Sequence, residues 1–271
     1  MAHHIFKADL RVGFVVFGIP EEEFDRLNQP KLELQYKAHK IACKTEPKMI
    51  SMTTQYELEK EPNVLENFED QLLTFAKQEM TQDAAHDISH IKRVVKTAKS
   101  LCAQEQAELD VVLPAAYLHD CFTFPKNHPD RATSSKVAAD KAIAFLKSID
   151  YPAHHLDAIH HAIVTHSYSA NITPETVEAQ IVQDADRLDS LGAIGIARCL
   201  FVGQSFDAEL YNHEDPFAKD RDLDDKSFSV DHFYVKLFKL AKTMNTESAK
   251  QEAQRRTDYM RAFLDQLASE V

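Results

Sequence analysis

The sequence predicts an all-α protein, and two observations lead to that prediction. From about residue 65 to the C-terminus, apolar residues recur at spacings of three and four almost without interruption, which is typical of helices that bury one face. The one β-like run, residues 12–19, lies near the N-terminus, and the chain has only 5 Gly. We therefore expect a helical bundle over residues 65–271, preceded by a poorly defined N-terminal extension over residues 1–51.

The extension differs from the rest of the chain in composition. It combines the β-like run with two of the five Gly and a polar, basic stretch from Lys31 to Lys48. One interpretation is a terminal segment that packs loosely against the domain. The other is a misassigned reading frame, in which Met49 or Met52 is the true start.

The first half of the bundle is expected to contain three helices. Apolar positions over residues 68–75 indicate the first, and a stripe from Ile88 to Cys102 indicates the second. We expect Asp110 to cap the third, with Pro114 in its first turn, where the missing N–H of a proline costs little. This helix ends on the adjacent pair His119–Asp120.

The second half begins after a polar loop over residues 122–131. Thr133 or Ser134 is expected to cap the next helix, and Thr173 with Pro174 should open a later one that ends near Gly192. The remaining apolar segments predict helices around residues 156–163, 231–242 and 246–268, with an acidic loop at about residues 207–226.

Composition narrows the possible functions. A formal net charge of −12 argues against general nucleic-acid binding, because neutralisation of phosphates supplies most of that affinity. The sequence also contains no glycine-rich phosphate loop of the Walker or dinucleotide type. Any phosphate would therefore have to be held by a metal ion and by cationic side chains.

Cysteine usage and hydropathy predict a cytoplasmic protein that does not enter a membrane. No apolar run is long enough to cross a bilayer, and residues 10–19 lack the basic start and the cleavage site of a signal peptide. The scattered cysteines fit reduced thiols better than a disulfide framework: Cys43, Cys102, Cys121 and Cys199. Either a monomer or a homodimer is compatible with the sequence.

Four side chains from three predicted helices could share one metal ion. His90 lies beside the second apolar stripe, His119–Asp120 end the third helix, and Asp186 lies in a later one. Each alone is commonplace, since a histidine beside an apolar stripe is more often a hydrogen-bonded core residue than a ligand. Buried imidazoles and carboxylates are costly without partners, however, and one divalent ion at an open site would satisfy all four.

The order of these residues resembles the defining pattern of the HD-domain metal-dependent phosphohydrolases. The resemblance covers about residues 65–271 and, in its fuller strings, is similar to the YedJ-type branch of that superfamily. Five strings carry it: His86-Asp87…His90-Ile91-Lys92-Arg93-Val94, Leu118-His119-Asp120, Pro125-Lys126-Asn127-His128-Pro129-Asp130-Arg131, Asp184-Ala185-Asp186-Arg187-Leu188-Asp189 and Gly192-Ala193-Ile194-Gly195-Ile196-Ala197-Arg198.

The resemblance implies a helical HD fold with one divalent metal ion on His90, His119, Asp120 and Asp186. It implies hydrolysis of a phosphate ester or phosphoanhydride of a small metabolite (class EC 3.1 or 3.6). A nucleotide is the favoured substrate, because some compact relatives are nucleotide pyrophosphohydrolases. Mn²⁺ is the favoured ion, although Mg²⁺, Co²⁺, Ni²⁺, Fe²⁺ or Zn²⁺ would also suit mixed His and carboxylate ligands.

The expected mechanism is attack on phosphorus by a metal-bound hydroxide, since a divalent metal lowers the pKa of bound water. Asp189 lies one helical turn after Asp186 and could orient that water or accept its proton, with Asp120 as a second catalytic carboxylate.

Candidate phosphate-binding cations lie near the ligands: Lys126, Arg131, Arg93 and Arg187. They could equally be surface cations, or pair with Asp184 or Asp189. Several further histidines could support the ligands or hold a second ion, with a single ion preferred: His86, His128, His160, His161 and His166.

Two other functions remain open. The leading alternative is a catalytically silent regulatory protein that binds a metal and a nucleotide. The other is a purely structural helical protein, in which the same His and Asp residues form polar core pairs.

Overall fold

The computed structural model describes residues 64–80, 87–125, 128–167 and 169–271. Across these residues every regular element is helical, and the only β-type pairing is an isolated bridge between Glu209 and Phe228. The predicted all-α fold class is confirmed. The N-terminal extension, His86 and Lys126 lie outside the described residues. No helix in the described part of the chain is long and apolar enough to span a membrane.

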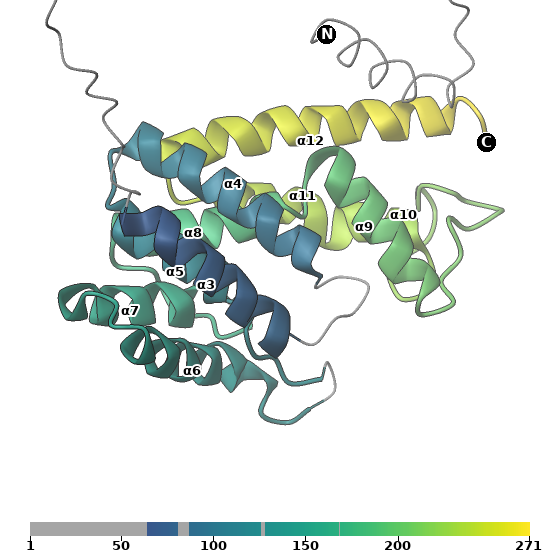
Figure 1. Cartoon of the computed structure of the whole chain (residues 1–271). Coiled ribbons are helices and arrows are strands. Elements are labelled where there is room, and N and C mark those ends of the chain that lie inside the picture. The colour runs from purple at the N-terminus through teal and green to yellow at the C-terminus, as the bar shows by residue number, and fades with distance from the viewer. Residues whose placement is uncertain (1–63, 81–86, 126–127, 168) are drawn as a thin grey trace, which may run out of the picture. The chain divides into compact units, whose positions relative to one another are not determined.

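The helices follow the chain in the order shown in Figure 1. Their bounds are α3 (Val64–Glu79), α4 (Ile88–Glu105), α5 (Leu109–Leu118), η2 (Arg131–Thr133), α6 (Ser134–Ser148), η3 (Ala153–His155), α7 (Leu156–His166), α8 (Val177–Leu188), α9 (Gly192–Gln204), α10 (Ser229–His232), the π-helical turn η4 (Phe233–Leu237), α11 (Phe238–Leu240), η5 (Ala241–Thr243) and α12 (Glu247–Ala268).

Helix α5 lies at the centre of the bundle. Every residue from Val111 to Leu118 is buried, and the helix packs against α3, α4, α6, α7 and α8. A helix that is apolar on all sides is stable only in such a position, because each of its faces must leave water. His119 and Asp120 follow its last turn and are therefore delivered into the protein interior.

Pro114 lies deeper in α5 than the sequence suggested. The helix begins at Leu109 behind Glu108, so Asp110 is in the first turn and does not cap it, and Pro114 is in the second turn. A proline there cannot donate to the carbonyl four residues earlier, which is that of Asp110. The hydroxyl of Tyr151 donates to this carbonyl instead (2.7 Å), so the helix continues through the proline.

The turn from α8 into α9 was also predicted incorrectly. Thr176 caps α8 by accepting a hydrogen bond from the amide of Ala179, so Thr173 and Pro174 precede the helix without opening it. Gly192 starts α9, a helix that periodicity did not predict, and it has a positive φ of 72°. A Cβ at Gly195 would collide with the carbonyl of Ser190, so the close reversal between the two helices requires glycine.

The long C-terminal helix α12 packs against α4, α8 and α9 (Figure 1). Thr246, which the sequence analysis placed at the first position of this helix, caps it by accepting from the amide of Ala249. The wholly buried carboxylate of Asp184 accepts from the amides of Asn245 and Thr246 (2.9 and 2.8 Å) and from the Thr246 hydroxyl. Arg256 donates to the carbonyl of Leu188 (2.6 Å). The end of α8 is thus attached to α12 on both sides of Asp186.

Candidate metal centre

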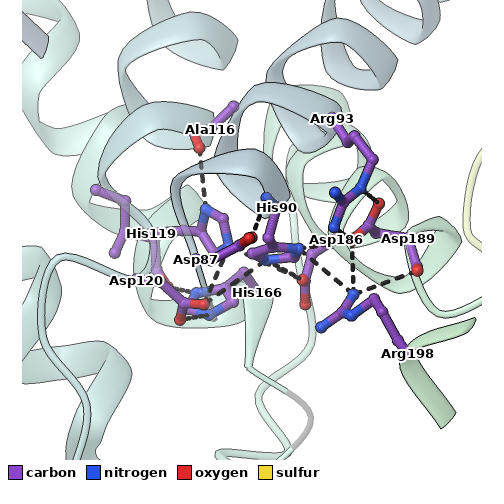
Figure 2. Close-up of polar contacts among 11 residues, drawn as sticks. Asp87, His90, Arg93, Ala116, His119, Asp120, His166, Asp186, Asp189 and Arg198 are labelled. Carbon is purple, nitrogen blue, oxygen red and sulfur yellow. Dashed lines mark hydrogen bonds and ion pairs between the residues drawn. The ribbon is translucent and has the colours of Figure 1, made fainter. Parts of the chain in front are cut away.

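Three helices bring the four predicted ligands to one place (Figure 2). Asp87 caps α4 and accepts a hydrogen bond from the amide of His90 (2.7 Å), which sets the first turn of that helix. His119 and Asp120 follow the end of α5, and Asp186 lies in the last turns of α8. The two histidines are buried, whereas Asp186 keeps 29% of its side chain exposed.

The Nε2 atoms of both histidines point at the same two carboxylates. His90 Nε2 lies 3.4 Å from Asp186 Oδ1 and 3.8 Å from Asp120 Oδ2. His119 Nε2 lies 3.5 Å from Asp120 Oδ2 and 3.8 Å from Asp186 Oδ1. Ligand atoms of His90, His119 and Asp120 fall within 4.8 Å of one another. This is the size and composition of a site for one divalent cation.

The surroundings of His119 show most directly that these residues suit a divalent cation. Its Nδ1 donates to the carbonyl of Ala116 (3.0 Å), which leaves the lone pair on Nε2. Burial lowers the pKa of His119, so the ring is neutral. Among the described residues its buried Nε2 has no hydrogen-bond partner, and a lone pair that faces carboxylates cannot bond to them. A metal ion would satisfy the nitrogen and both carboxylates together.

His90 is oriented from behind by Asp189. His90 Nδ1 donates to Asp189 Oδ2 (2.8 Å), and the same carboxylate accepts from Arg93 (2.7 Å to Nε) and Arg198 (2.6 Å to Nη1). Burial on its own would lower the pKa of His90, but hydrogen bonds to Asp186 and Asp189 raise it to about 9. A carboxylate on the rear nitrogen is the usual support of a metal-binding histidine.

The predicted role of Asp189 in activating water is not the one that its contacts favour. Only 4% of its side chain is exposed, and both oxygens are occupied by the hydrogen bonds from Arg93, His90 and Arg198. Such a carboxylate positions His90. Arg93, predicted as a phosphate-binding residue, forms the ion pair with Asp189 that the sequence left open as the alternative.

The two other predicted phosphate-binding residues that the structure describes, Arg131 and Arg187, lie in different places. Arg131 lines the cavity described below and donates to the carbonyl of Phe124. Arg187 donates to the carbonyl of Thr243 (2.8 Å), in the segment before α12.

Of the additional histidines, only His166 reaches the centre among those that the structure describes. It is buried, its Nε2 lies 3.6 Å from Asp120 Oδ1, and its ring centroid is 4.8 Å from that of His119. Three others have different partners: His128 stacks on Phe124, His160 pairs with Asp140, and His161 accepts from the amide of Glu175.

A cavity of about 760 Å³ opens onto the centre and is lined there by Asp120, Asp186 and His166. This volume is in the range of small-molecule sites. Its walls carry four basic side chains that the sequence reading did not assign, namely Arg198, Lys226, His232 and Lys236. They come from α9 and from the segment after it. Arg198 ends one of the resemblance strings, whereas no sequence pattern singled out Lys226, His232 or Lys236.

Comparisons with known proteins agree with this geometry. A family model described as the HD domain matches residues 87–191, a segment that contains all four candidate ligands. Bacillus subtilis YpgQ is 29% identical over 207 residues, which cover 74% of this chain and 93% of YpgQ. A structure of YpgQ in complex with ADP superimposes with a TM-score of 0.59, at 27% identity, over 75% of this chain and 97% of YpgQ. An HD-superfamily hydrolase from Bacillus thuringiensis is 35% identical, with a TM-score of 0.59, over 75% and 96% of the two chains.

Proposed function

Because the chain belongs to the HD superfamily of hydrolases, we propose that it is a metal-dependent phosphohydrolase. Its substrate is a small phosphorylated metabolite, a nucleotide, in which it cleaves a phosphate ester or phosphoanhydride. The observation that carries this proposal is the buried Nε2 of His119, which faces the carboxylates of Asp120 and Asp186. Membership of the YedJ-type branch stays a prediction.

We assign His90, His119, Asp120 and Asp186 as ligands of a single divalent ion, with Mn²⁺ favoured. A bound ion of this kind supplies Lewis acidity and lowers the pKa of an adjacent water molecule towards neutrality. The carboxylate of Asp186 is ready for this role at neutral pH. Burial alone would raise its pKa, but the hydrogen bond with His90 and the nearby imidazoles hold the pKa below the ordinary value.

The remaining side chains of the centre hold the ligands and move a proton. Asp189, itself fixed by Arg93 and Arg198, keeps the His90 ring aimed into the site. Asp120 Oδ1 and His166 Nε2 lie 3.6 Å apart, and both residues line the cavity. This pair is the best-placed acceptor of a proton from an attacking water molecule, held finally at His166 Nε2.

Two observations favour a nucleotide. The related YpgQ was crystallised in complex with ADP, and the cavity beside the centre has room for a ligand of that size. Arg131 and Arg198 line the same cavity, and guanidinium groups suit phosphate oxygens because they donate in a fork. Arg198 already donates to Asp189 through Nη1, so any contact with phosphate would use its remaining donors.

The test is a screen of nucleoside mono-, di- and triphosphates against Mn²⁺, Mg²⁺, Co²⁺, Ni²⁺, Fe²⁺ and Zn²⁺. Phosphate and pyrophosphate release are measured separately, so that the scissile bond is identified. We expect turnover in the wild-type protein and loss of both metal retention and turnover in His119→Ala and Asp186→Ala. Unchanged hydrolysis in either variant would refute the proposal. Nucleotide binding without any product would favour the silent regulatory protein.

A further inference from the structure

The cavity has two walls of different chemistry. One wall holds Asp120, Asp186 and His166 of the metal centre. The other holds Lys226, His232 and Lys236, which we call the distal wall. It is formed by the turn before α10 and by the helical turns that follow. Its basic character is conspicuous in a chain whose formal net charge is −12.

An ion pair whose carboxylate is buried restrains the distal wall. Asp231, which is fully buried, accepts from Arg221 Nη1 and Nη2 (2.6 and 2.9 Å) and from the amide of Asp224 (2.7 Å). Arg221 also donates from Nε to the carbonyl of Asp215 (3.0 Å). A two-point guanidinium–carboxylate contact fixes direction as well as distance. These contacts restrain the segment that carries Lys226 and His232.

Both lysines of this wall have exposed side chains, which a ligand can reach. His232 Nδ1 donates to Asp225 Oδ2 (2.9 Å), so the one carboxylate of this segment that lines the cavity is already engaged. Neither Lys226 nor Lys236 forms an ion pair with any residue that the structure describes. Lys226 acts electrostatically on Asp224, which does not line the cavity. Ammonium groups on the wall of a cavity attract anions, because the low-dielectric walls focus their field.

We propose that the distal wall binds a second anionic group of the substrate, apart from the group held at the metal centre. Lys226 and Lys236 contact that group, and the Asp225–His232 pair shapes the wall between them. The site then selects ligands that carry at least two anionic groups in a chain over those that carry one. This inference rests on the proposed function, since the metal centre has to hold the first group.

The first test is a binding measurement with inorganic probes. Tripolyphosphate and orthophosphate are titrated calorimetrically into protein in excess Mn²⁺, for the wild type, for Lys226→Ala/Lys236→Ala and for Lys239→Ala. Lys239 is an exposed lysine of α11 that does not line the cavity, so it controls for a general loss of positive charge.

The double variant should bind tripolyphosphate about 10- to 100-fold more weakly, which corresponds to about tenfold for each lost charge-assisted contact. Its affinity for orthophosphate should change less than about threefold, and Lys239→Ala should match the wild type. Equal losses for the two probes, or equal losses in the control variant, would overturn the inference. An unchanged affinity for tripolyphosphate in the double variant would do the same.

The second test uses turnover of ATP and of 4-nitrophenyl phosphate. In the double variant, KM for ATP should rise about 10-fold or more, and the preference for ATP over the small ester should fall by a similar factor. If tripolyphosphate binding depends on the lysines but no substrate is turned over, anion binding by the distal wall is supported and the proposed phosphohydrolase activity is refuted. If the wild type and the double variant hydrolyse ATP equally well, the phosphohydrolase activity is supported and anion binding by the distal wall is refuted.

Discussion

Nδ1 of His90 donates a hydrogen bond to Oδ2 of Asp189 at 2.8 Å, across 99 residues of chain. The bond joins the first turn of α4 to the end of α8, and Arg93 and Arg198 hold the acceptor from two sides. The orientation of His90 is therefore set by a residue on the side of its ring opposite the candidate metal centre.

The Asp189→Asn variant should weaken binding of Mn²⁺ by about 10- to 100-fold, which is the usual effect of removing the carboxylate behind a metal-binding histidine. The asparagine keeps the size of the side chain but removes the charge that His90 and the two arginines face. Isothermal titration with Mn²⁺ measures the change. Asp157→Asn, an exposed acid on α7, is the control and should bind normally. An affinity within about twofold of the wild type would show that Asp189 has no such role.

Addition of Mn²⁺ should stabilise the protein, since an ion that binds only the folded state shifts the unfolding equilibrium. At a free concentration of about 100 times Kd, the gain is about 2.7 kcal/mol. Urea unfolding with and without the ion measures it. In Asp186→Ala the gain should disappear, because one of the two facing carboxylates is gone. A full gain in that variant would place the ion elsewhere.

Replacement of Tyr151 by phenylalanine should destabilise the fold by about 1–3 kcal/mol, since the carbonyl of Asp110 then loses its hydrogen bond inside the bundle. Pro114→Ala restores an N–H that can donate to this carbonyl. The double variant Tyr151→Phe/Pro114→Ala should therefore recover part of the loss. Urea unfolding of the complete double-mutant cycle checks this. Strictly additive effects would mean that the two groups do not share the carbonyl.

Glu252 predicts a pH-dependent contribution to stability. Hydrogen bonds from Arg255 and Arg256 lower its pKa from 4.5 to about 2, although burial opposes this change. Because the folded-state pKa is depressed, the stabilisation is present above about pH 4.5 and is lost as the pH falls towards 2. The ion pairs are partly exposed, so their contribution should stay below about 1 kcal/mol.

The measurement is the unfolding free energy of Glu252→Gln relative to the wild type between pH 2 and 7. The difference should be largest above pH 4.5 and should vanish near pH 2. Glu247→Gln, on the same helix but 73% exposed, should show a smaller difference. A Glu252 effect that grows as the pH falls would have the wrong sign for this explanation.

Periodicity predicted the helical class because most helices bury a single face, and α4 and α8 illustrate this with stripes of buried residues at spacings of three and four. The resemblance to the HD-domain pattern implied His90, His119, Asp120 and Asp186 as one ligand set, and the structure brings these four residues together. These inferences depend on local pattern, which a single sequence contains.

What the sequence did not reveal depends on contacts between distant residues. Helix α5 continues through Pro114 because Tyr151, 41 residues after Asp110, donates to the Asp110 carbonyl that the proline cannot reach. Helix α9 begins at a glycine with positive φ, a residue that ordinarily ends helices. Lys226 lies in a loop without apolar periodicity, and the Arg221–Asp231 pair that restrains this loop joins two residues that no local pattern connects.

The attachment of α12 to α8 has a consequence for metal binding after proteolysis. Asp184 accepts hydrogen bonds from the residues that cap α12, and Arg256 of α12 donates to the carbonyl of Leu188. The C-terminal helix therefore stabilises the backbone on both sides of Asp186. A protease nick within α12 would leave every proposed ligand intact in sequence. It would nevertheless free the backbone that positions Asp186. Metal binding would then weaken first through the loss of this ligand.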